Sequence, residues 1–132
     1  MYFTELLQNF TKSLDPNRPI TAAIAVPAQF LDIISFNRYN GWYANPGRIN
    51  MITSRVVDEA IAWNAKHHKP VLMSEYGADT VEGLHILPSF VWSEEYQRDL
   101  FSRHFKAFDI LRQYGWFIGE FIWNFADLRP IN

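Results

Sequence analysis

Hydrophobic positions along the chain alternate between a helical spacing and short continuous apolar runs. Three stretches have the spacing of amphipathic helices: residues 2–14, 49–67 and 93–114. Four short apolar runs have the length of strands: residues 19–25, 32–37, 70–75 and 117–123. Because helices and strands alternate, the pattern predicts an α/β fold with four parallel strands and helices on the outside, on one convex side.

Local signals support the helix limits. Asp15-Pro16 stops the first helix, Ser93 is a predicted N-cap followed by two acidic residues, and Gly115 ends the last helix. Two architectures fit this order, a small open α/β sheet or part of a (β/α)₈ barrel. No glycine-rich phosphate loop follows any strand, which argues against the nucleotide-binding form of the open sheet.

Composition narrows the class of protein. The 132 residues suit one domain, with 48% hydrophobic and 20% charged residues. A net charge of -2 without a basic run argues against nucleic acid. The sequence contains no run of ~18 apolar residues, so we expect no membrane span. It does not start with a basic segment followed by an apolar one, so we expect no signal peptide at residue 1. The 17% aromatic content indicates either a bulky core or a pocket whose walls stack against sugars.

Polar and aromatic residues collect where three of the predicted strands end. These segments are Asn37–Tyr43, Ser74–Asp79 and Trp123–Asp127. In an α/β barrel the active site lies at the carboxyl ends of the strands. Glu75 is the strongest candidate for a nucleophile, with Tyr76 beside it and Arg38 across from it as groups that could aim the carboxylate. A structural glutamate that caps the next helix or pairs with Arg38 is the alternative.

Five ordered blocks of the sequence resemble β-glucuronidases of glycoside hydrolase family 2. The blocks are residues 14–19 (LDPNRP), 36–43 (FNRYNGWY), 74–80 (SEYGADT), 92–97 (WSEEYQ) and 119–127 (GEFIWNFAD). The resemblance covers almost the whole chain. It implies that residues 1–132 form part of one TIM-barrel domain, with no second domain, and that the four strands are barrel strands five to eight.

The resemblance also implies roles for particular residues. Glu75 matches the family's retaining nucleophile, and a set of neighbours is implied to bind the sugar: Asn37, Arg38, Tyr39, Tyr43 and Trp123. Packing and strand-end hydrogen bonding remain the alternatives for this set. The family places its acid/base elsewhere than Glu120, which we therefore interpret as structural. No cofactor and no metal are implied, because carboxylates carry out the reaction.

The implied reaction is retaining hydrolysis of β-D-glucuronides through a glycosyl-enzyme on Glu75. The substrate class would be a β-glucuronide or a sugar derived from glycosaminoglycans. Full-length family members are implied to be homo-oligomers, and eukaryotic ones lysosomal or secretory. The family's acid/base block, Asn-Glu-Pro, and its carboxylate-binding block, Asn-x-Lys, have no match here, so we expect the isolated chain to be inactive.

Two further readings remain open. The chain could be a non-catalytic fragment that binds a partner. It could also come from a β-galactosidase or β-mannosidase, which share the scaffold, although the block at residues 37–43 favours the glucuronidase.

Overall fold

The fold is an α/β layer in which parallel strands alternate with helices. A computed structural model of the chain describes residues 3–23 and 28–125. Its elements are, in chain order, α1 (Phe3–Leu14), the 3₁₀ turn η1 (Ala28–Phe30), β1 (Ile34–Asn37), the 3₁₀ turn η2 (Ile49–Met51), α2 (Ile52–His67), β2 (Val71–Tyr76), α3 (Glu94–Arg112) and β3 (Phe117–Ile122). The three predicted helices are thereby confirmed. Within the described ranges, no helix is both long and apolar enough to cross a membrane.

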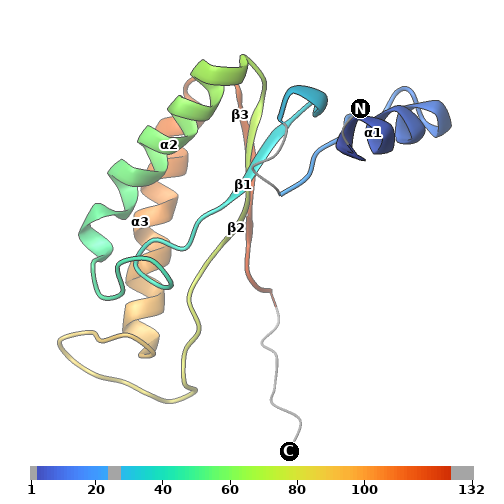
Figure 1. The fold of residues 1–132 in the computed structure, drawn as a ribbon. Helices are drawn as coiled ribbons and strands as arrows, with labels where there is room; N and C mark the ends of the chain where they lie inside the picture. The colour runs from blue at the N-terminus through green and yellow to red at the C-terminus, as the bar shows by residue number, and fades with distance from the viewer. Residues whose placement is uncertain (1–2, 24–27, 126–132) are drawn as a thin grey trace, which may run out of the picture.

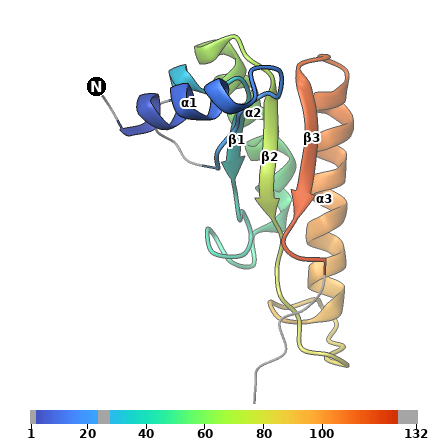
Figure 2. The same ribbon diagram turned by 90° about the vertical axis from the view of Figure 1, so that its right-hand side faces the viewer.

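The strands form a single sheet in the order β1-β2-β3, and both neighbouring pairs are parallel. Helices α2 and α3 connect consecutive strands and cover the same face of the sheet (Figures 1 and 2). All three strands point the same way, so their carboxyl ends meet at one end of the molecule. This confirms the predicted parallel α/β arrangement and sets one edge at which side chains from three strands can meet.

The prediction of four strands is wrong, because the described part of the first run, residues 19–23, forms no strand. The rest of that run, residues 24–25, lies outside the described residues. The backbone hydrogen bonds of this segment converge on Ile20. Its N–H donates to the Asp32 carboxylate at 2.8 Å, and its carbonyl accepts from the N–H groups of Asp32 at 2.9 Å and Ile33 at 3.3 Å. A parallel ladder instead needs evenly spaced bonds from successive residues.

Helix α1 does not join the other two helices, contrary to the prediction of a common convex side. It lies across the opposite face of the sheet, near the amino ends of β1 and β2 (Figures 1 and 2). The ion pair of Lys12 with Asp32, at 2.9 Å, holds it to the chain just before β1. Because the described residues between α1 and β1 form no strand, they give the helix no adjacent strand to pack over. Its apolar Leu7, Phe10 and Leu14 are more than half exposed.

The core lies between the sheet and the pair α2 and α3. Val56 of α2, Leu100 and Phe108 of α3, and Val71 and Met73 of β2 are fully buried. At roughly 25 cal/mol per Å² of apolar surface, this layer supplies the main stabilisation of the sheet. The N-cap of α3 is confirmed, because the Ser93 hydroxyl accepts a hydrogen bond from the Tyr96 N–H at 3.2 Å.

A buried histidine lies in this core directly behind the strand that carries Glu75. The His104 ring is fully buried and stacks on Tyr76, with 4.8 Å between ring centroids. Its Nδ1–H donates to the Leu100 carbonyl oxygen at 2.9 Å, whereas Nε2 has no partner among the described residues. Burial lowers the pKa of His104 from 6.5 to about 4, because a charged ring is poorly solvated there.

We expect this histidine to make the fold sensitive to acid. The folded state holds His104 neutral, so its stabilising effect is complete above the ordinary pKa of 6.5 and is lost as the pH falls towards about 4. The loss approaches about 3 kcal/mol. His104→Phe should remove most of this slope. Urea unfolding of both proteins at pH 7.5 and pH 4.5 measures the free energy of unfolding. An equal decrease between the two pH values in the parent and the variant would contradict the assignment.

Candidate active site

A β-bulge in β2 sets the direction of Glu75. Phe36 pairs with Met73 and the next residue of β1, Asn37, pairs with Glu75, so β2 advances two residues where β1 advances one. Without the bulge, strict alternation would direct Glu75 to the same face as Met73, which is fully buried against the helices. With it, Tyr76 takes the buried direction and Glu75 lies half-buried on the other side.

Tyr39 holds the Glu75 carboxylate. The Tyr39 hydroxyl donates a hydrogen bond to Glu75 Oε2 over 2.6 Å. Partial burial raises the pKa of Tyr39, and the hydrogen bond to Glu75 and the charge of Glu75 raise it further. Tyr39 therefore keeps its proton as a donor across the working range of pH, and one carboxylate oxygen is fixed in place.

Neither of the two side chains proposed to aim Glu75 has a hydrogen bond to its carboxylate. Tyr76 packs instead against α3, edge-on to Phe101 and Phe108 and stacked on His104. Arg38 lies on the helix side of the sheet, where Nε donates to Glu59 Oε2 of α2 at 2.7 Å and Nη2 donates to Oε1 of the same carboxylate. The backbone N–H of Arg38 donates to the Glu75 carbonyl at 2.9 Å, but its guanidinium is bound to Glu59 and not to the Glu75 carboxylate.

Asn37 lies at the end of β1, and its amide links two strand ends. Its Oδ1 accepts a hydrogen bond from the Ser74 hydroxyl at 2.7 Å. Ser74 directly precedes Glu75, so this bond fixes the bulged segment against β1. Asn37 is therefore in place beside Glu75, with the amide nitrogen as its remaining donor.

Tyr43 and Trp123 lie with Tyr39 around a small hollow at the carboxyl ends of the strands. The Tyr39 and Tyr43 rings have centroids 4.9 Å apart. Tyr43 is 74% exposed and Trp123 is 49% exposed, so both present aromatic surface to solvent. The residues that line the hollow are Tyr39, Trp42, Tyr43, Gly77, Ala78, Asp79 and Trp123. Three of these also line a neighbouring hollow of about 300 Å³ that extends to Pro46, Val91 and Trp92.

Trp92 was not predicted as a site residue. It lies 17 positions after Glu75 in the sequence. The Val81 N–H donates to the Trp92 carbonyl at 2.9 Å, and the Trp92 ring lies edge-on to Trp42 with 4.6 Å between centroids. Only the folded path of the loop brings Trp92 to the hollow. The one signal in the sequence is its position directly before Ser93, the predicted N-cap, which places Trp92 at the start of a helix.

The ends of β2 and β3 approach each other closely at Gly77. The Trp123 N–H donates to the Tyr76 carbonyl at 2.8 Å. A Cβ atom on Gly77 would lie 2.2 Å from the Trp123 carbonyl oxygen. Only glycine therefore allows the two strand ends to lie at this separation, which brings Trp123 to the same hollow as Tyr39.

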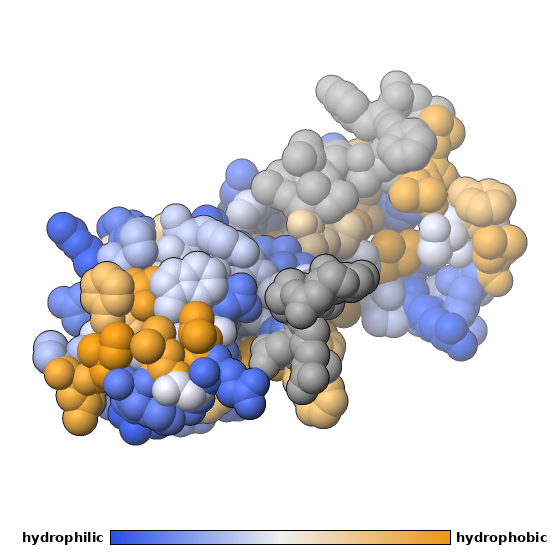
Figure 3. Space-filling model, turned by 90° about the horizontal axis from the view of Figure 1, so that it is seen from below, coloured by the Kyte–Doolittle hydropathy of each residue, from blue (hydrophilic) through white to orange (hydrophobic). Residues whose placement is uncertain are grey.

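The loop between β2 and α3 covers the same end of the molecule. His85 Nδ1 lies 2.7 Å from Glu95 Oε1, and this hydrogen bond, with the charges of Glu94 and Glu95, raises the pKa of His85. The contact holds the loop to the first turn of α3. Leu87 and Phe90 of the loop are strongly exposed, and Figure 3 shows hydrophobic side chains gathered at the end of the molecule where this loop lies.

The other carboxylate of this sheet, Glu120 in β3, does not face Glu75. It forms an ion pair with Arg112 in the last turn of α3. This contact accounts for the carboxylate as a link between β3 and the helix that precedes it, in line with a structural role.

Comparisons with known proteins agree in naming one family. Residues 1–130 match the family described as glycosyl hydrolases family 2, TIM barrel domain. A β-glucuronidase from Paenibacillus borealis is 41% identical, with 96% of this chain and 22% of the relative covered. The Homo sapiens β-glucuronidase is 36% identical, with 96% of this chain and 20% of the relative covered. The chain thus spans about one fifth of the length of these curated relatives.

Solved structures give the same result. The β-glucuronidase of an uncultured Clostridium sp. superposes with a TM-score of 0.84 at 41% identity, over 93% of this chain and 22% of that one. A Ruminococcus gnavus β-glucuronidase in complex with D-glucuronic acid superposes with a TM-score of 0.82 at 34% identity, over 97% of this chain and 24% of that one.

Proposed function

The chain belongs to the glycosyl hydrolases family 2, TIM barrel domain, and from this premise we propose that it supplies the nucleophile of a retaining β-glucuronidase. One observation carries the proposal. Glu75 lies at the carboxyl end of β2, where active sites of α/β barrels lie, with its Oε2 held 2.6 Å from the Tyr39 hydroxyl. The names of the relatives, all β-glucuronidases, support the choice of sugar.

In the proposed reaction, the Glu75 carboxylate attacks the anomeric carbon of the glucuronide. The second carboxyl group of the retaining mechanism, ~5–5.5 Å away, protonates the leaving oxygen as the glycosidic bond breaks. The sugar then remains as an ester on Glu75. Water, deprotonated by the same second group, attacks the anomeric carbon and releases the sugar with its configuration retained.

Tyr39 is the positioning residue of this step. Its hydroxyl binds Oε2, which leaves Oε1 of Glu75 as the oxygen for attack. A fixed carboxylate loses little freedom when it reacts, so less of the barrier is entropic. Because its pKa is raised, Tyr39 does not compete with the second carboxyl group as a proton donor.

The remaining predicted residues have different support. Tyr43 and Trp123 expose aromatic surface in the hollow lined by Tyr39, whose hydroxyl binds Glu75, as stacking on a sugar ring requires. The Asn37 amide nitrogen is available to a sugar hydroxyl, since only Oδ1 is used by Ser74. Arg38 is paired with Glu59 on the helix side, so its binding of the sugar requires that this pair opens.

The experiment that tests the proposal is covalent labelling of Glu75. We define the chimera as the Clostridium β-glucuronidase in which residues 1–132 of this chain replace the matching segment. A 2-deoxy-2-fluoro glucuronide with a good leaving group should form a stable ester on the nucleophile. Mass spectrometry of a peptic digest should find the added mass on the peptide that contains Glu75. A label on Glu120, or none during turnover, would contradict the assignment.

A second function, an interaction segment without catalysis, is favoured by the apolar surface of β3. Ile118 is 49% exposed, Phe121 is 61% exposed and the following Trp123 is 49% exposed. Apolar surface of this kind is normally covered by protein. An inactive but folded chimera, with no label on Glu75, would favour this second function.

A further inference from the structure

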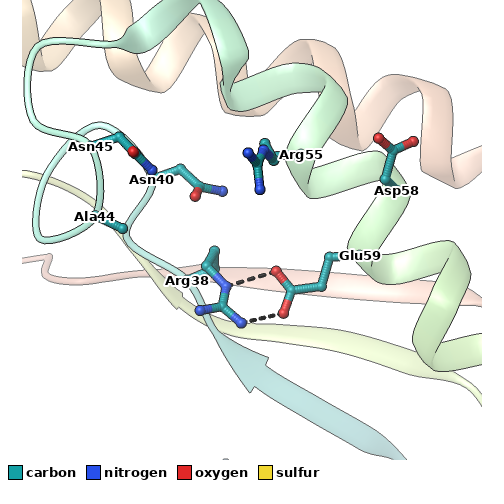
Figure 4. A pocket seen from close by; sticks show the side chains of 7 residues that line it. All are labelled: Arg38, Asn40, Ala44, Asn45, Arg55, Asp58 and Glu59. Carbon is teal, nitrogen blue, oxygen red and sulfur yellow. Dashed lines mark hydrogen bonds and ion pairs between the residues drawn. The ribbon is translucent and has the colours of Figure 1, made fainter.

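A polar hollow lies on the helix side of β1, apart from the Glu75 site. Its volume is about 620 Å³, within the range of small-molecule sites. The loop after β1 forms one wall and α2 the other (Figure 4). The polar side chains that line it are Arg38, Asn40, Asn45, Arg55, Asp58 and Glu59. None of them lines the hollow beside Glu75.

Two arginines and two carboxylates line this hollow, but only one of each forms an ion pair within the described part of the chain. Arg38 and Glu59 neutralise each other through two hydrogen bonds, which Figure 4 shows at the base of the hollow. Arg55 makes no ion pair with any described residue, and neither does Asp58, one turn further along α2. In Figure 4 the Arg55 guanidinium points into the hollow, whereas the Asp58 carboxylate points away from it. The unpaired cation, Arg55, is therefore directed into the hollow, and the unpaired carboxylate, Asp58, lies at its wall with its oxygens directed away.

A buried amide adds a second unmatched donor. Asn40 is 6% exposed, and its Nδ2 has no hydrogen-bond partner among the described residues. A buried donor without an acceptor costs ~1–3 kcal/mol. In Figure 4 the nitrogen end of this side chain is directed towards Arg55. An acceptor at the base of the hollow beside Arg55 would satisfy both groups if the Asn40 amide turns towards it, because Nδ2 is itself buried.

We propose that this hollow binds a small molecule through an oxyanion, a carboxylate or a phosphate. The planar guanidinium of Arg55 matches two oxygens of such a group, and the Asn40 amide donates to one of them. Asn45 lines the same hollow and offers a further polar contact for a hydroxyl group. The site is independent of the proposed glycosidase activity, because no step of that reaction uses these residues.

The test is a titration of the ¹⁵N-labelled chain of residues 1–132, followed by NMR at constant ionic strength in a phosphate-free buffer. Sodium phosphate and sodium glucuronate are the two probes, and glucose is the neutral comparison. We expect saturable shifts of the Asn40 side-chain amide and of the Arg55 Nε–H. Arg55→Gln should weaken binding by about tenfold or more, since a charge-assisted bond is lost.

The matched control is Arg103→Gln, which removes the same charge from an exposed position on α3 outside the hollow. It should leave the affinity unchanged. Binding of both probes supports the shared oxyanion, and binding of one identifies its source as phosphate or carboxylate. Linear shifts without saturation, equal shifts with glucose, or equal weakening by both substitutions would overturn the proposal. Unchanged backbone spectra of the variants confirm that they are folded.

Discussion

Glu75→Gln in the chimera is expected to lower kcat for an aryl β-glucuronide by more than about 10⁴-fold. An amide cannot form the glycosyl ester, so the covalent route is lost, whereas positioned proton transfer alone accounts for ~10²–10⁴ in rate. The side chain keeps its size and can still accept the Tyr39 hydrogen bond, so KM should change little. Steady-state kinetics with a chromogenic glucuronide measure both constants.

The matched control for this variant is Glu120→Gln. Glu120 has the same charge and lies on the neighbouring strand, but it pairs with Arg112 rather than with the site. Its loss should cost stability and leave kcat within about tenfold of the parent. If Glu120→Gln abolishes turnover and Glu75→Gln does not, the two carboxylates have been assigned in the wrong order.

Gly77→Ala should damage both stability and activity, without any change of charge. The new methyl group would lie 2.2 Å from the Trp123 carbonyl oxygen, far inside contact distance, and neither a Cβ atom nor a backbone oxygen can turn aside. The ends of β2 and β3 must then separate, which breaks the hydrogen bond from the Trp123 N–H to the Tyr76 carbonyl. We expect a loss of about 3 kcal/mol in the free energy of unfolding of the chimera's barrel, and of at least about 10²-fold in kcat/KM, since misplaced groups react poorly.

Gly83→Ala separates this collision from ordinary glycine effects. Gly83 has a φ of +76°, so alanine is strained there, but nothing would lie within 4 Å of its Cβ atom. Its substitution should cost about 1 kcal/mol and spare catalysis. Equal losses for the two variants would show that backbone strain, rather than the contact with Trp123, governs the response at Gly77. Urea unfolding and kinetics of both variants provide the comparison.

The helices and the location of the candidate site follow from local sequence signals. Ser93 with its two acidic followers marks the start of α3, and the apolar spacing gives α2 to within a few residues. The parallel order then places Glu75 and Trp123 at one end of the sheet. These features depend on short-range interactions, which the sequence displays directly.

The features that sequence missed depend on how segments pair. Residues 19–23 have the composition of a strand, yet their hydrogen bonds converge on Ile20, and no local pattern reports that. The direction of Arg38 was partly within reach, because neighbouring residues of an extended segment alternate faces. If Tyr39 faces Glu75, Arg38 must face α2. Glu75 itself was directed by a shift of register between β1 and β2, which requires knowledge of both strands.

The bulge in β2 has a consequence for which changes of sequence this chain can accept. Met73 and Tyr76 both face the helices, and the bulge exists because two residues rather than one stand between them. Deletion of Ser74 would leave one residue between them, so simple alternation would keep Tyr76 against the helices and Glu75 on the other face. The deletion would remove the hydrogen bond from the Ser74 hydroxyl to Asn37, which fixes this strand end against β1. The packing of this strand should therefore accept a deletion at Ser74, and the attachment of its end to β1 should weaken.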